Sequence, residues 1–142
     1  MRKVLLSCMI GMSLVQLTAC NATGSAREAL TTDMSQVQLR QIQSRAFDTT
    51  NRTKMLRTII STLQDLGFVI DKADDELGTV SATKLNGYQL RMTVTVRPKG
   101  SKQLLVRANA QYMVTTVEDP LPYQQFFTSL EKAIFLTAHQ VE

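Results

Sequence analysis

The protein has 142 residues, enough for one domain with a hydrophobic core. It carries 16 basic and 12 acidic residues, a formal net charge of +4 at pH 7. Residues 1–19 hold two of the basic residues and none of the acidic ones, which leaves 14 basic against 12 acidic residues in the remainder. A balance this close does not support a nucleic-acid partner.

The N-terminal region has the pattern of a secretory signal peptide. Arg2 and Lys3 precede an apolar run over residues 4–15, and a charged start followed by such a run is typical of these signals. The alternative is an uncleaved anchor helix, which needs roughly 20 apolar residues to span a bilayer. The run is shorter than that, so the sequence favours a signal over residues 1–19.

The signal ends in an aliphatic residue, two small residues and a cysteine, Leu17-Thr18-Ala19-Cys20. This ending resembles the lipobox of bacterial lipoproteins. The resemblance implies that the peptide is cut before Cys20 and that lipid chains on this cysteine anchor the protein to a membrane. Residue 21 is Asn and not Asp, and by resemblance to enterobacterial sorting this favours the outer membrane, facing the periplasm, over the inner membrane.

The cysteine count limits the chemistry of the processed chain. The lipobox resemblance implies that Cys8 leaves with the signal and that Cys20 is acylated, so we expect no cysteine to remain for a disulfide, a thiol nucleophile or a metal site. We expect residues 20–41 to form the lipidated cysteine and a flexible tether, because the first of them are small and polar. Val37, Leu39 and Ile42 could begin a strand. A single domain is expected over residues 42–142.

Apolar residues recur at helical spacing from about Asn51 to Leu66, which predicts an amphipathic helix. Asn51 is an N-cap candidate, and Gly67 stands where a left-handed residue would end the helix. A short strand over residues 68–70 and a charged loop over residues 71–76 follow. The loop lacks the alternating spacing of an EF-hand. Its acidic side chains therefore predict a solvated turn and no calcium site: Asp71, Asp74, Asp75 and Glu76.

Apolar and polar residues then alternate, which predicts antiparallel strands over residues 79–85, 88–96 and 104–112. Asn86-Gly87 favours a two-residue hairpin, and residues 98–101 favour a second turn. A last, aromatic-rich helix is expected to begin at Asp119-Pro120. The predicted class is α+β: an antiparallel sheet of three to five strands with two helices packed on one face.

The order of elements over residues 53–80 is similar to a known family. An amphipathic helix leads to Leu-Gln-Asp-Leu-Gly-Phe-Val-Ile, an acidic turn and Gly-Thr-Val-Ser-Ala. This order resembles the helix-grip domains of BamC, an accessory lipoprotein of outer-membrane protein assembly, although this chain has room for only one such domain. The processed chain also looks like small lipoproteins of Gram-negative bacteria. The resemblance implies a helix-grip-like fold and carries over no catalytic residue.

Candidate catalytic groups are scarce. The sole histidine, His139, is the fourth residue counted from the C-terminus, so neither a Ser-His-Asp arrangement nor a histidine-based zinc site is expected. The glycines are scattered singly among turns, which gives no phosphate loop. We therefore predict no enzyme activity, no cofactor and no metal.

The polar phase of the predicted strands is the more informative feature. One interpretation is the ordinary solvated face of an antiparallel sheet. The other is a docking surface, because arginine suits bidentate contacts with carboxylate or phosphate. The residues proposed for docking are Gln89, Arg91, Arg97, Arg107, Asn109 and Gln111.

Two functions follow from these patterns. The first is a non-catalytic accessory subunit of an outer-membrane assembly, secretion or efflux complex, held at the membrane through Cys20 and binding an envelope protein but no nucleic acid. The alternative is a binding protein for a lipid or small hydrophobic ligand, enclosed between helices and sheet. A cavity above roughly 300 Å³ under the helices would favour the alternative.

Overall fold

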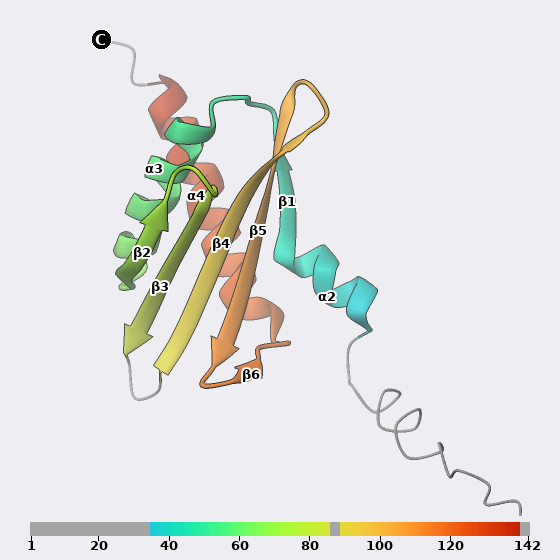
Figure 1. Cartoon of the computed structure of the whole chain (residues 1–142), viewed down its shortest axis with the longest axis vertical. Coiled ribbons are helices and arrows are strands. Elements are labelled where there is room, and N and C mark those ends of the chain that lie inside the picture. The colour runs from blue at the N-terminus through green and yellow to red at the C-terminus, as the bar shows by residue number, and fades with distance from the viewer. Residues whose placement is uncertain (1–34, 86–88, 140–142) are drawn as a thin grey trace, which may run out of the picture. The chain divides into compact units, whose positions relative to one another are not determined.

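The computed structural model describes residues 35–85 and 89–139, so the predictions for the signal peptide, Cys20 and the Asn86-Gly87 turn lie outside the described residues. The described part is an α+β domain built on an antiparallel sheet (Figure 1). The strands, in sheet order β1-β5-β4-β3-β2 with β6 paired to β5, are β1 Ser44–Phe47, β5 Gln103–Tyr112, β4 Gln89–Lys99, β3 Thr79–Leu85, β2 Val69–Asp74 and β6 Thr115–Thr116.

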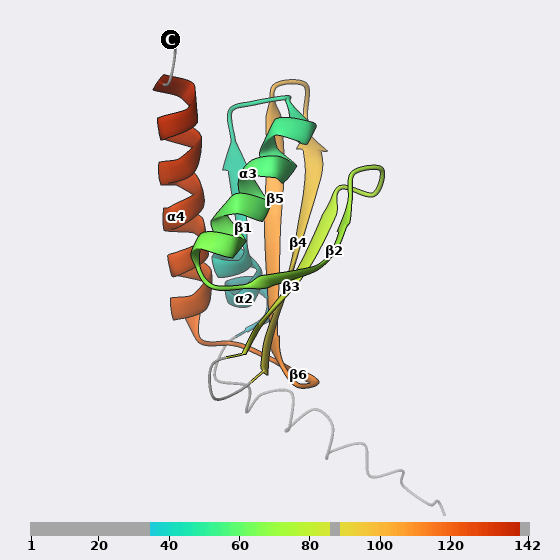
Figure 2. The same ribbon diagram turned by 90° about the vertical axis from the view of Figure 1, so that its left-hand side faces the viewer.

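Three helices accompany the sheet: α2 Gln36–Gln43, α3 Arg52–Asp65 and α4 Pro120–His139. Helices α3 and α4 lie side by side on one face of the sheet, while α2 precedes the edge strand β1 (Figure 2). The predicted class and the antiparallel sheet are confirmed. The predicted count is wrong, because the described residues form six strands and three helices in place of three to five strands and two helices. None of these helices is long and apolar enough to cross a membrane.

Helix α2 corrects the prediction of a tether or strand over Val37, Leu39 and Ile42. Ser35 and Gln38 form a capping box: the Ser35 hydroxyl accepts from the Gln38 amide N–H at 3.2 Å, and the Gln38 side chain accepts from the Ser35 N–H at 3.0 Å. The helix buries only Leu39 and Gln43. Eight residues with so narrow a buried stripe give little periodic signal, so the cap is the better marker of this helix.

Both predicted ends of α3 are confirmed. The Asn51 side chain accepts from the Lys54 N–H at 2.9 Å as N-cap. At the other end Gly67 has φ +83°, and the Phe68 N–H donates to the Leu63 carbonyl at 2.9 Å. These two features make a Schellman motif, which satisfies helix carbonyls that would otherwise lack donors.

Two predicted turns begin later than expected. Strand β2 continues to Asp74, with a register irregularity between Ile70 and Lys72, so the turn covers residues 75–78 and not residues 71–76. Strand β4 continues through Pro98 to Lys99, so its turn covers residues 100–102. In both cases cross-strand pairing extends the strand over residues that favour turns when read alone.

The core fills the space between α3, α4 and the sheet. Tyr123, Phe126 and Phe127 from α4 are at most 1% exposed, and Ile59 and Leu63 from α3 are fully buried. The Phe126 and Phe127 rings meet edge to face with centroids 5.1 Å apart. The sheet contributes aliphatic side chains and one methionine from alternate positions, namely Val80, Ala82, Met92, Val94, Val96, Leu104, Val106, Ala108 and Ala110.

Candidate functional site

The pairing of β4 with β5 brings the proposed docking residues onto one surface. Residues directly opposite each other in an antiparallel sheet point to the same side. Arg91 lies opposite Gln111, and Arg107 lies opposite Thr95. We call the side of the sheet turned away from α3 and α4 the polar face. On β4 and β5 it carries all six predicted residues together with two threonines: Gln89, Arg91, Thr93, Thr95, Arg97, Arg107, Asn109 and Gln111.

A shallow hollow of about 370 Å³ lies at the centre of the polar face. It brings Arg97, Arg107 and Asn109 together, whereas Gln89, Arg91 and Gln111 do not line it. Hydroxyls from β4 and one apolar side chain from β5 complete the lining, so the hollow offers guanidinium donors, hydroxyl groups and a small apolar contact. Its full lining is Thr93, Thr95, Arg97, Leu105, Arg107 and Asn109.

The arginines of the polar face have no carboxylate partner within residues 35–85 and 89–139. In that part of the chain the single ion pair joins Arg45 to Glu131 at 2.7 Å, on the helix-covered side. Arg45 also lies 5.0 Å from the centroid of the Phe127 ring. Arg91, Arg97 and Arg107 are exposed. A guanidinium presents donors in a planar fork that matches carboxylate or phosphate oxygens, so the polar face is suited to an anionic partner.

A buried glutamine that the sequence analysis did not single out forms hydrogen bonds with two residues of the polar face. Gln43, at the end of α2, is 1% exposed. Its amide nitrogen donates to the Asn109 side-chain oxygen at 3.0 Å and to the Tyr123 hydroxyl at 3.3 Å. Its oxygen accepts a longer hydrogen bond, 3.4 Å, from Arg107. Asn109 and Arg107 are therefore held in place by a residue from another element.

Tyr123 connects this network to the core. Its hydroxyl donates to the Val117 carbonyl at 2.6 Å and accepts from the Ala110 N–H at 3.2 Å. The ring is fully buried in the helix layer. A satisfied buried network of this kind fixes side-chain positions more firmly than exposed contacts do. The capping box at Ser35 could have revealed α2, but nothing in the sequence marks Gln43 itself.

The acidic segment between β2 and β3 forms local hydrogen bonds. The Thr83 hydroxyl donates to Asp71 at 2.6 Å, and the Asp74 carboxylate accepts from the Leu77 N–H at 2.8 Å. Arg52 from α3 donates to the backbone carbonyls of Asp75 and Glu76. Within the described ranges no three histidine, cysteine or acidic side chains group as metal ligands would.

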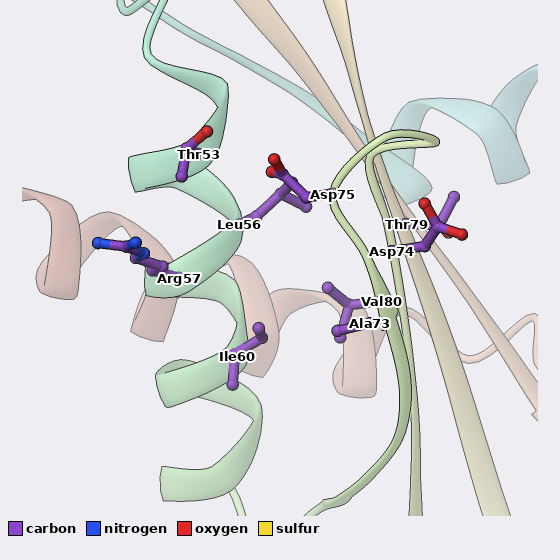
Figure 3. A pocket seen from close by; sticks show the side chains of 9 residues that line it. All are labelled: Thr53, Leu56, Arg57, Ile60, Ala73, Asp74, Asp75, Thr79 and Val80. Carbon is purple, nitrogen blue, oxygen red and sulfur yellow. The ribbon is translucent and has the colours of Figure 1, made fainter.

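A second hollow, of about 280 Å³, separates α3 from the β2–β3 hairpin (Figure 3). Leu56 and Ile60 on the helix face Val80 and Ala73 on the strands, whereas Arg57 points away from the gap. The lining also includes polar and charged side chains, among them Thr53, Asp74 and Asp75, but the Asp74 carboxylate already accepts from the Leu77 N–H. The polar face remains the better candidate for recognition.

A scan of protein-family models finds no match to this chain, and a search of curated proteins finds none either.

Proposed function

We propose that this protein is a lipid-anchored, periplasm-facing lipoprotein that acts as a non-catalytic accessory subunit of an outer-membrane assembly, secretion or efflux complex. In this proposal Cys20 carries the anchor and the polar face binds an envelope protein through an acidic or otherwise anionic segment. The lipobox-like ending at Cys20 and the helix-grip-like order of elements, with α3 and α4 on one face of an antiparallel sheet, support it.

The observation that carries the docking proposal is the hollow around Arg97 and Arg107. The two guanidinium groups lie without a carboxylate partner in the described part of the chain, beside threonine hydroxyls. The Gln43 network positions Arg107 and Asn109 before a partner arrives. Preorganised donors lose less entropy on binding than freely rotating ones do, so such a surface favours specific contacts with carboxylates.

The alternative function, enclosure of a lipid or small hydrophobic ligand, has less support. The space between the helices and the sheet is occupied by aromatic and aliphatic side chains that are at most 1% exposed, Tyr123, Phe126 and Phe127 among them. Three hollows beside the helices have volumes of about 280, 230 and 220 Å³. These lie below the roughly 300 Å³ at which ligand pockets begin.

The anchor is tested by mass spectrometry of the protein extracted from membranes. We expect Cys20 as the first residue, carrying lipid, and Cys20→Ser should leave the chain uncleaved or displaced from the membrane fraction. An intact Met1 or an unmodified Cys20 would contradict the proposal.

Docking is tested by a photo-crosslinking amino acid at Thr95, inside the hollow, with a matched probe at Gln124, which is exposed on α4. The probe at Thr95 should capture one envelope protein that the probe at Gln124 does not. Equal capture at both positions would remove the polar face from the proposal.

A further inference from the structure

One end of the sheet exposes apolar side chains on a tight hairpin. Strand β5 turns into β6 through two residues, Met113 and Val114, since Tyr112 pairs directly with Thr115. Met113 is 70% exposed and Val114 is 92% exposed. Leu85, which ends β3 at the same end of the sheet, is 79% exposed (Figure 1).

The backbone of this hairpin is strained by the residue that the sequence places there. Among the described residues other than glycine, Met113 is the one with a positive φ, 54°. A positive φ at the first of two loop residues is the geometry of a type II′ turn, a position that glycine prefers. A bulky side chain there is unfavourable for folding. Two large apolar residues at an exposed, strained tip point to a contact made outside the domain.

The chain leaves the domain toward this same end. Figure 1 places the start of α2 toward the end of the sheet that holds the β5–β6 hairpin, while the β4–β5 turn lies at the opposite end. Residues 20–34 precede this point, and at 3.3–3.6 Å per residue they reach about 50 Å at most. The described part of the chain therefore begins toward the apolar tip, and a bilayer that holds Cys20 lies within reach of that end.

We propose that Met113 and Val114 insert into the surface of the bilayer to which Cys20 is anchored, and so fix the orientation of the domain. This inference rests on the proposed lipid anchor. With the tip in the lipid, β4 and β5 run away from the membrane and the polar face looks sideways along it, toward a neighbouring membrane-bound partner. In this orientation Tyr112, which directly precedes Met113, lies at the membrane–water interface, where tyrosine is enriched in membrane proteins.

The charged residues near Met113 and Val114 indicate which lipid composition the insertion requires. Glu118 and Asp119 follow β6, and Arg91 lies opposite Gln111 one position before the end of β5. Acidic and basic groups are thus mixed around the tip, so the insertion is apolar in origin. We expect it in zwitterionic vesicles, with no gain from anionic lipid.

The test uses the acylated protein, purified from membranes and reconstituted in phosphatidylcholine vesicles. An environment-sensitive fluorophore is attached at Val114→Cys, and a matched one at Ser101→Cys on the opposite β4–β5 turn. An acylated Cys20 leaves no other thiol in the processed chain. Lipids brominated on their acyl chains should quench the probe at position 114 several-fold more than the probe at position 101.

The variant Met113→Gly in the labelled protein distinguishes insertion caused by the Met113 side chain from insertion caused by the fluorophore's own affinity for lipid. We expect the thermal midpoint to stay or rise, because glycine relieves the strain, and the quenching at position 114 to fall at least twofold. Unchanged quenching in this variant would show that the fluorophore alone inserts, which would overturn the inference.

The remaining outcomes are also decisive. A mass without lipid in the same preparation contradicts both the proposed function and this inference. Acylated protein with equal quenching at positions 114 and 101 contradicts the inference alone. A third outcome also contradicts the inference. If the brominated lipids do not quench the probe at position 114, but a co-purified protein shields it from aqueous iodide, then the tip binds a protein and not the bilayer.

Discussion

The helix-covered face of the sheet and the polar face differ in how their side chains are satisfied. On the covered side Val94, Val106 and Ala108 are fully buried against α3 and α4, and Arg45 is paired with Glu131. On the polar face Arg91 and Arg97 have no carboxylate partner within the described ranges. The comparison shows that alternate side chains of β4 and β5 lie in different environments. One set packs in the core, and the other leaves guanidinium groups exposed without a carboxylate partner in the described ranges.

The largest effect should come from the covered side. Phe126→Ala removes a fully buried ring that packs edge to face on Phe127. We expect a loss of about 3–5 kcal/mol in the free energy of unfolding, measured by chemical denaturation. Gln124→Ala, an exposed change on the same helix, should stay within about 0.5 kcal/mol. Similar losses for the two variants would mean that the helix layer is not the core.

Two glycines with similar φ angles allow the effect of packed surroundings on stability to be compared with that of open surroundings. Gly78 has φ +69°, and a Cβ there would lie 2.7 Å from the Val96 carbonyl oxygen. Gly100 has φ +64° with no atom within 4 Å of the same position. We expect Gly78→Ala to lower the free energy of unfolding by about 2–4 kcal/mol and Gly100→Ala by about 1 kcal/mol. Equal losses would show that only the backbone angle matters.

Gln43 joins the two faces, so its substitution should affect both stability and binding. Gln43→Leu leaves the Asn109 and Arg107 side chains without this partner and weakens the bonding of the buried Tyr123 hydroxyl. We expect a loss of about 1–3 kcal/mol in the free energy of unfolding. Gln36→Leu, exposed on the same helix, is the control and should change little. A Gln43→Leu protein as stable as the wild type would contradict a role for this network in stabilising the domain.

The long alternating strands and the end of α3 were predictable from sequence, whereas the short strands and the contacts of Gln43 were not. Strict alternation over residues 89–97 and 104–111 assigned each arginine to its face, and Gly67 marked the end of α3 because a left-handed residue was required there. Strands β1 and β6 are four and two residues long, too short for a periodic signal. The role of Gln43 depends on residues more than 60 positions away in the chain, which local patterns do not contain.

The smallest effect on folding should come from the polar face. Replacing Arg91, Arg97 and Arg107 with Ser removes exposed side chains, and substitutions of this kind usually change the free energy of unfolding by no more than about 0.5 kcal/mol each. Loss of the long hydrogen bond that Arg107 donates to Gln43 adds a further cost of about 0.5–1 kcal/mol. The circular dichroism spectrum should match that of the wild type. Loss of folding in this triple variant would mean that the two faces have been assigned the wrong way round.

The most direct test of the account is the recovery of the envelope partner by this triple variant. The control replaces Lys54, Arg57 and Lys132 with Ser, which removes the same charge from exposed positions of the helix layer. Truncating desolvated interfacial charges costs about 2–5 kcal/mol, so the polar-face variant should lose at least tenfold in partner recovery after crosslinking in membranes. The control should recover the partner as the wild type does. Equal recovery by the folded polar-face variant, the control and the wild type would contradict a docking role for the polar face.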